Sequence, residues 1–233
     1  MSNAAKEPLQ IALIGATGLV GRMVMEAVIG REDVRLTAIA RREVPLPKGV
    51  RMEMIISKPG RWGDVLEEIQ PTAMICALGT TWKRAGKDEQ AFRAVDQELV
   101  LNSAKVAKEK GVERFVVVTS VGANVGSRSL YLRVKGEVER DLAMLKFKRL
   151  DILHPGLLKG ARIDDRRAGE GIAQALSPVM NVMMHGPLKD MRSIDARNVA
   201  AGALALASRK PGGRFTHNNE AIMRAAREWS AQE

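Results

Sequence analysis

Apolar runs of strand length alternate with segments of helical periodicity over the first two thirds of the chain. Buried strands are predicted at residues 9–16, 34–40, 50–56, 71–78, 112–120 and 147–156. Helices are predicted between them, after the first strand to about Ile29 and at residues 62–69, 89–110 and 131–145. Strands that stay apolar throughout, with helices between them, indicate a parallel sheet covered on both faces. Right-handed crossovers make such a sheet doubly wound.

The pattern changes after Gly156. Residues 157–192 are rich in charged residues, Gly and Met, and we interpret them as a small substrate lobe over the carboxyl ends of the strands. Three further elements are predicted, a helix at 195–208, a short strand at 213–215 and a helix at 219–230. We therefore expect an α/β fold, a Rossmann-like doubly wound parallel sheet in one domain over residues 1–233, with the small C-terminal lobe inside it.

Composition limits the location and the chemistry. Hydrophobic residues make up 45% of the 233 residues, and no apolar run reaches the length of a membrane-spanning helix. The only cysteine, Cys76, excludes an internal disulfide, and the three histidines are too dispersed for a metal site. The first four residues are typical of an expression-vector remnant, and no signal peptide is recognised. We therefore expect a cytoplasmic protein without a metal centre.

The net charge of +10 raises the question of a polyanionic partner. A basic balance is typical of proteins that bind nucleic acid or an anionic membrane. Here Lys and Arg are spread among Asp and Glu, and the aromatic residues that would stack on bases make up only 3%. The charge therefore favours solubility or the attraction of a small phosphorylated ligand, and nucleic-acid binding stays as a minor alternative.

The segment IALIGATGLVGRMV, residues 11–24, places three glycines between the first predicted strand and the first predicted helix. A tight turn uses the backbone freedom of glycine, and a helix N-terminus offers N–H groups and a favourable dipole to a pyrophosphate. The spacing is Gly-x-x-Gly-x-x-Gly rather than Gly-x-Gly-x-x-Gly, so the position after a strand carries the prediction. A strand–helix turn without a ligand is the alternative. The residues expected to contact a dinucleotide are Gly15, Thr17, Gly18, Leu19, Val20 and Gly21.

Arginines stand at the end of the second predicted strand, where NAD-binding proteins carry an acidic residue for the free ribose 2′-hydroxyl. A guanidinium is suited to bidentate contact with a phosphate. Arg41, together with Arg22 after the third glycine, is therefore predicted to bind the 2′-phosphate of NADP(H). Arg42 is equally consistent with such a contact and with a solvated side chain. Glu43 is expected to lie too far past the strand to serve a ribose.

Tyr131, the only tyrosine, is followed four residues later by Lys135, which places both on one face of a helix. An ammonium stabilises a nearby phenolate, and a tyrosine so placed can exchange a proton near neutral pH. Thr119 and Ser120 end the preceding strand, and ligands bind at the carboxyl ends of strands in this architecture. A surface tyrosine beside a surface lysine is the alternative. The order of the segments favours a site in which Ser120 holds a carbonyl group, a role that Thr119 could share.

GATGLVG, the segment at Ser120, YLRVK and HPG, in this order, resemble the short-chain dehydrogenase/reductase superfamily. CALGTTWKRAG (76–86), VDQELVLNSAKVAKEKGVERFVVVTSVGA (95–123) and YLRVKGEVERDL (131–142) are similar to its atypical branch that contains the Tat-interacting-protein oxidoreductases. The resemblance covers most of residues 9–160. It implies an NADP(H)-dependent oxidoreductase that transfers a hydride to or from a carbonyl-like small-molecule substrate.

The resemblance also implies residue roles. Tyr131 would be the general acid/base, Lys135 would hold the nicotinamide ribose, and Ser120 would orient the substrate. Two cofactor-binding segments are implied, Ala77, Leu78, Gly79 and Thr80 beside the adenine and its ribose, and Pro155, Gly156 and Leu157 near the nicotinamide. Members of the superfamily often form homodimers, and the sequence does not decide the oligomeric state.

Two positions depart from the superfamily pattern. Asp96 lies near the place of an asparagine that relays protons in many members, and His154 replaces a frequent arginine. We interpret His154 as a buried structural histidine. The branch also includes members that bind NADP(H) without clear catalysis, so a regulatory redox sensor is the alternative function. Three methionines of the predicted lobe fit either an adaptable apolar wall or plain core, Met180, Met183 and Met184.

Overall fold

The computed structural model describes residues 7–160 and 192–231, and its centre is a seven-stranded parallel sheet. The strands are β1 (Leu9–Ile14), β2 (Val34–Ala40), β3 (Glu53–Ile56), β4 (Ala73–Cys76), β5 (Arg114–Val118), β6 (Arg149–Leu153) and β9 (Gly213–His217). Their spatial order is β3-β2-β1-β4-β5-β6-β9, so the order reverses direction between β1 and β4. The predicted doubly wound, Rossmann-like sheet is confirmed.

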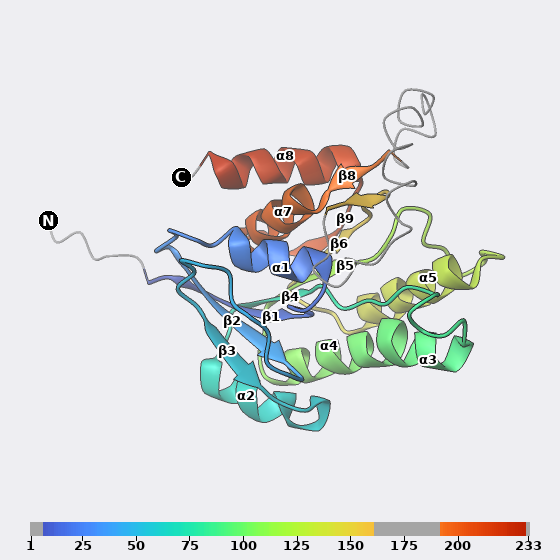
Figure 1. Ribbon diagram of the computed structural model, residues 1–233, viewed down its shortest axis with the longest axis horizontal. Coiled ribbons are helices and arrows are strands. Elements are labelled where there is room, and N and C mark those ends of the chain that lie inside the picture. The colour runs from blue at the N-terminus through green and yellow to red at the C-terminus, as the bar shows by residue number, and fades with distance from the viewer. Residues whose placement is uncertain (1–6, 161–191, 232–233) are drawn as a thin grey trace, which may run out of the picture.

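Helices cover both faces of this sheet (Figure 1). One layer contains α1 (Leu19–Glu26), α7 (Ala196–Ser208) and α8 (Asn219–Ser230). The other contains α2 (Trp62–Ile69), preceded by the short 3-10 turn η1 (Pro59–Arg61), and α3 (Glu89–Arg93), α4 (Val100–Glu109) and α5 (Leu130–Met144). Each layer has its own apolar core against the sheet, one with Val24 and Leu204, the other with Trp62 and Phe115. None of the helices in the described ranges is long and apolar enough to cross a membrane.

The helix predicted over residues 89–110 is divided into three consecutive segments. Between α3 and α4 lies the π-helical segment η2 (Ala94–Leu99). A π-helical turn takes up more residues than an α-turn, and such turns are frequent at functional sites. The apolar spacing on either side remains helical, so the sequence pattern gives no sign of the change. The wider turn carries Asp96, whose side chain is only 1% exposed.

The predicted lobe over residues 157–192 falls mostly outside the described residues, and Met180, Met183 and Met184 lie there as well. At its two ends, β7 (Leu158–Lys159) and β8 (Ile194–Asp195) pair in parallel as a small separate sheet. The last strand is longer than predicted, because β9 pairs with β6 as far as His217.

Candidate active site

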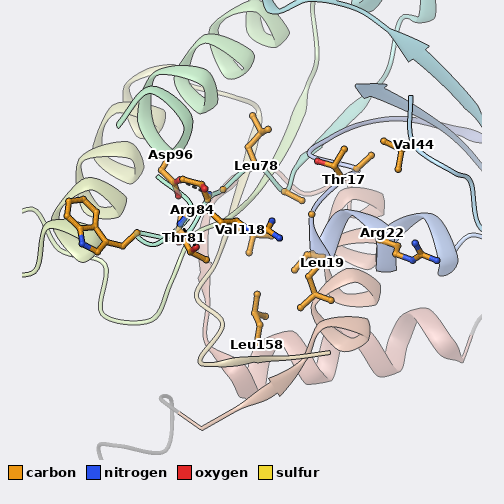
Figure 2. Close-up of a pocket in the computed structure, with 18 of the residues that line it drawn as sticks. Thr17, Leu19, Arg22, Val44, Leu78, Thr81, Arg84, Asp96, Val118 and Leu158 are labelled. Atoms are coloured by element: carbon orange, nitrogen blue, oxygen red, sulfur yellow. Dashed lines mark hydrogen bonds between the residues drawn. The ribbon is translucent and has the colours of Figure 1, made fainter. Parts of the chain in front are cut away.

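A cavity of about 590 Å³ opens where β1, β4 and β5 end. Carboxyl ends of strands on either side of the reversal in strand order are where ligands bind in doubly wound sheets. Figure 2 shows Thr17, Leu19 and Arg22 on one side of the cavity and Asp96 and Arg84 on the other. A second cavity of about 300 Å³ adjoins it between the ends of β1 and β2, and the two share several wall residues, Ala16, Thr17, Arg42 and Leu78. Together they form an elongated site.

The glycine turn lies against the first cavity, and two of its glycines are required by the protein backbone itself. Gly15 has φ +89°, and a Cβ there would lie 2.5 Å from the carbonyl of Ala77. A Cβ at Gly21 would lie 2.2 Å from the carbonyl oxygen of Gly15, so α1 approaches β1 closely at this point. Gly18 caps α1 without a side-chain hydrogen bond, and Gly18 and Leu19 line the cavity. The N–H groups at the N-terminus of α1 thus have no side-chain cap, and this end of the helix can receive an anion.

The predicted arginines are distributed over the two cavities. Arg22 lines the first cavity and forms an ion pair of 3.1 Å with Glu26, whereas Arg41 lines the second. Arg42, which the sequence left open, lines both. Glu43 also lines the first cavity, because the chain after β2 continues along its wall through Val44 and Pro45. The part of the site beyond the end of β2 therefore contains a carboxylate as well as guanidinium groups.

Tyr131 and Lys135 both line the first cavity, one turn apart near the start of α5. Close packing fixes this part of the helix, because a Cβ at Gly136 would lie 2.4 Å from the backbone of Asn124. Of the two hydroxyls that end the preceding strand, Thr119 lines the cavity and donates to the carbonyl of Leu153 at 3.2 Å.

Ser120 points to a different partner. Its hydroxyl donates to the carbonyl of Val121 at 3.2 Å. Ser120 is not one of the described residues that line the two cavities. The structure therefore brings Thr119, Tyr131 and Lys135 together at one wall and leaves Ser120 beside them.

The ammonium group of Lys135 is paired with a carboxylate. Its Nζ lies 2.8 Å from Oδ1 of Asp96, and the two side chains are 5% and 1% exposed. Burial acts to lower the pKa of Lys135, but the attraction of Asp96, followed by that of Tyr131, outweighs it, so the pKa is raised. The other carboxylate oxygen of Asp96 accepts the backbone N–H of Thr80 at 2.7 Å. The sequence singled out Asp96 only by its place near the superfamily's asparagine. Its two partners, Lys135 and Thr80, come from segments distant in the chain.

The loop after β4 supplies wall residues that the motifs did not indicate. Thr81, Trp82 and Arg84 follow the expected Ala77–Thr80 segment directly and line the same cavity. The ring of Trp82 meets Phe92 edge-on, with 6.1 Å between centroids. The ring of Phe92 in turn lies 5.8 Å from that of Tyr131. Ligands bind beyond the carboxyl ends of strands in this architecture, and on that basis the whole loop after β4 could have been predicted to line the site.

None of the residues expected near the nicotinamide, Pro155, Gly156 and Leu157, is among the described residues that line the two cavities, and the first cavity is reached by the next residue. Its wall contains Leu158, whereas Leu157 is 58% exposed. The Gly156 N–H donates to the Asn219 side chain at 2.9 Å, which ties this segment to α8. His154 is half-buried with Nε2 2.8 Å from Oε1 of Glu139, which agrees with a structural role. Within residues 7–160 and 192–231 no cluster of His, Cys, Asp and Glu could hold a metal ion.

Cys76 at the end of β4 should be unreactive in the folded protein. Its side chain is fully buried, and burial raises the pKa of the thiol from 9.0 to about 11. The thiolate is the reactive form, so this rise alone should slow alkylation about 100-fold near pH 8. Mass spectrometry after iodoacetamide treatment, with the urea-unfolded chain as the control, measures this rate. Native labelling as fast as in urea would contradict the burial of Cys76.

A family model described as HIM1 matches residues 52–186 of the chain. The chain is 37% identical over 162 residues to protein FMP52, mitochondrial, of Saccharomyces cerevisiae, which covers 68% of this chain and 70% of that protein. It is 33% identical over 214 residues to protein fmp52, mitochondrial, of Emericella nidulans, covering 87% and 91% respectively. These names point to mitochondria, so the predicted cytoplasmic location is wrong. Composition could not distinguish the two compartments, since both permit free thiols and neither requires a membrane span.

Solved structures similar to this chain share its fold. MoeE5 in complex with UDP-glucose and NAD superposes with a TM-score of 0.66 at 14% identity, covering 95% of this chain and 82% of that one. UDP-glucose 4-epimerase from Thermotoga maritima, with UDP-glucose, gives a TM-score of 0.68 at 12% identity, covering 94% and 82%. The likeness shows the Rossmann-like α/β fold.

Proposed function

The chain belongs to the HIM1 family, and on that premise we propose that it is an NADP(H)-dependent oxidoreductase acting on a carbonyl-like substrate. The observation that carries the proposal is the shared cavity, whose wall contains the N-terminus of α1, a tyrosine and a buried lysine. The first feature suits a pyrophosphate and the second suits proton transfer. The motifs of residues 76–142 further support a place near the Tat-interacting-protein oxidoreductases within the atypical short-chain branch.

Each residue at this wall has a role in the proposed reaction. The bound nicotinamide would supply or accept the hydride. Tyr131 would give its phenolic proton to the carbonyl oxygen as negative charge develops there, and would take it back in the reverse direction. The Thr119 hydroxyl, which lines the cavity, or that of Ser120 would turn from its backbone carbonyl partner and donate a hydrogen bond to the same oxygen. Lys135 would hold the ribose and keep positive charge beside the phenol.

NADPH should bind at least about tenfold more tightly than NADH, a difference of about 1.4 kcal/mol. The reason is the guanidinium groups at the ribose end, above all Arg42, which lines both cavities. Arg42→Ala should therefore weaken NADPH binding about tenfold and leave NADH binding unchanged. Titrations that follow nicotinamide fluorescence measure both affinities.

Arg61→Ala is the matched control, because this η1 side chain is 78% exposed, pairs with Asp64 three residues away and is not among the described residues that line the two cavities. If Arg42→Ala weakens NADH and NADPH equally, Arg42 does not read the 2′-phosphate, and Glu43 at the same end would then favour NADH. If the native protein binds neither dinucleotide, the oxidoreductase proposal falls.

A second candidate is an NADP(H)-binding redox sensor without turnover. The observation that favours it is the Ser120 hydroxyl, which donates to the carbonyl of Val121. A screen of carbonyl and quinone substrates against bound NADPH separates the two candidates. Turnover with any of them supports the oxidoreductase, and tight binding with no turnover across the screen supports the sensor.

A further inference from the structure

The ion pair between Lys135 and Asp96 is the most deeply buried pair of opposite charges at the cavity wall. The side chains are 5% and 1% exposed, and 2.8 Å separates Nζ from Oδ1. Removing two charges from water is costly, and the mutual attraction offsets that cost only where the geometry is good. A buried ion pair is therefore weak evidence for a gain in stability. Because this pair lies beside Tyr131, we look for its role in the site.

Asp96 has a second partner on the other side. Its Oδ2 accepts the backbone N–H of Thr80 at 2.7 Å, in the loop that follows β4. Gly79 packs over the pair, because a Cβ there would lie 3.5 Å from Oδ1 of Asp96 and 3.9 Å from Nζ of Lys135. The carboxylate therefore joins three segments, η2, α5 and the loop along the cavity wall.

The π-helical segment that carries Asp96 is itself fastened to α5. Nη1 of Arg93 lies 2.6 Å from Oε2 of Glu137, and the Gln97 side chain donates to the same oxygen at 3.1 Å. Residues on both sides of Asp96 are thus held to the helix that carries Lys135. This arrangement leaves the carboxylate little freedom to turn away from the ammonium group.

We propose that Asp96 is a positioning residue of the site, which holds Lys135 protonated and oriented and fixes the Gly79–Thr80 loop beside it. The proposal rests on the proposed function, since the lysine and the loop are the parts that would meet the cofactor ribose. Asp96 would act through these two groups, and it has no part in the proposed proton or hydride transfer itself.

Three titratable groups face Lys135 from separate elements, Asp96 from η2, Tyr131 from α5 and Cys76 from β4. Burial disfavours the ammonium, and the Asp96 carboxylate is the largest of the effects that oppose burial and raise the pKa of Lys135. Without that carboxylate, burial acts with less opposition, and the lysine should lose its proton at lower pH. The neutral amine would then be a poorer partner for the phenol and for the ribose.

Asp96→Asn tests this proposal, because the amide oxygen can still accept the Thr80 N–H while the negative charge is lost. Lysine 13Cε NMR of the protein without cofactor, with the Lys135 signal assigned through Lys135→Arg, gives the pH at which this group titrates. NADPH affinity measured from neutral to alkaline pH gives the second readout. Asp64→Asn, which removes an exposed carboxylate on α2, is the control.

We expect Asp96→Asn to move the Lys135 titration to lower pH and to weaken NADPH at least about tenfold near pH 9, with a smaller loss at neutral pH. A Lys135 titration that stays in place would overturn the proposal, whatever happens to NADPH. Asp96→Ala should add a pH-independent loss, because the Thr80 N–H loses its acceptor as well. If the native protein does not bind NADPH, the proposed function fails, while the NMR titration still decides whether Asp96 controls Lys135.

Discussion

Tyr131→Phe should lower turnover about 10²–10⁴-fold and leave the dissociation constant of NADPH nearly unchanged. The substitution removes only the hydroxyl that would deliver the proton. The ring contact with Phe92, at 5.8 Å between centroids, does not involve the hydroxyl and can persist. Single-turnover oxidation of NADPH with a substrate from the screen measures the rate, and nicotinamide fluorescence measures the affinity.

Two comparisons make this result specific. The thermal midpoint should stay close to that of the native protein, since Tyr131 is only half-buried at the start of α5. Weakened NADPH binding with unchanged turnover would contradict the role of Tyr131 as the proton donor. A fall in turnover that is accompanied by a fall in the thermal midpoint of unfolding would indicate local unfolding instead.

Gly21→Ala should destabilise the fold by about 1–3 kcal/mol or more and weaken NADPH about 100-fold. An added Cβ would lie 2.2 Å from the carbonyl oxygen of Gly15 and 2.9 Å from Cα of Ala16, and both contacts are with backbone that has no rotamer to change. The turn and the N-terminus of α1 must therefore move apart, which displaces the N–H groups offered to the anion. Urea unfolding and NADPH titration measure the two effects.

Gly60→Ala is the matched control for this substitution. Nothing lies within 4 Å of the added Cβ at Gly60, and the backbone there has no left-handed conformation. The change should stay within about 0.5 kcal/mol and leave NADPH affinity as it was. Equal stability of the two alanine variants would show that the close approach at Gly21 can relax without cost.

The elements that the sequence predicted best are those with a single dominant signal. The strand at 34–40 and the helix at 62–69 have the predicted bounds, because each has one uninterrupted pattern and clear breaks on both sides. The final helix also begins as predicted at Asn219, where the Asn218 side chain accepts the N–H of Ala221. These signals are local, so one sequence is enough to find them.

The site was predictable only where a motif fixes its own geometry. The glycine turn and the Tyr131–Lys135 spacing meet at one cavity, as their order in the chain indicated. The pairing of Lys135 with Asp96 depends on a π-helical turn, which the spacing of apolar residues does not indicate. The direction of the Ser120 hydroxyl depends on its hydrogen bond to the backbone carbonyl of Val121. Such details follow from tertiary contacts between segments far apart in the chain.

Helix α7 lies late in the sequence, so it is synthesised after most of the strands that it covers. This helix packs against β4, β5 and β6, and its Val199, Ala203 and Leu204 complete the apolar core on one face of the sheet. Until translation has passed residue 208, α1 is the only one of the described helices that can cover that face, although six of the seven strands of the sheet have already been synthesised. A nascent chain of that length presents an apolar surface to its surroundings, and we expect it to depend on chaperones until α7 has left the ribosome.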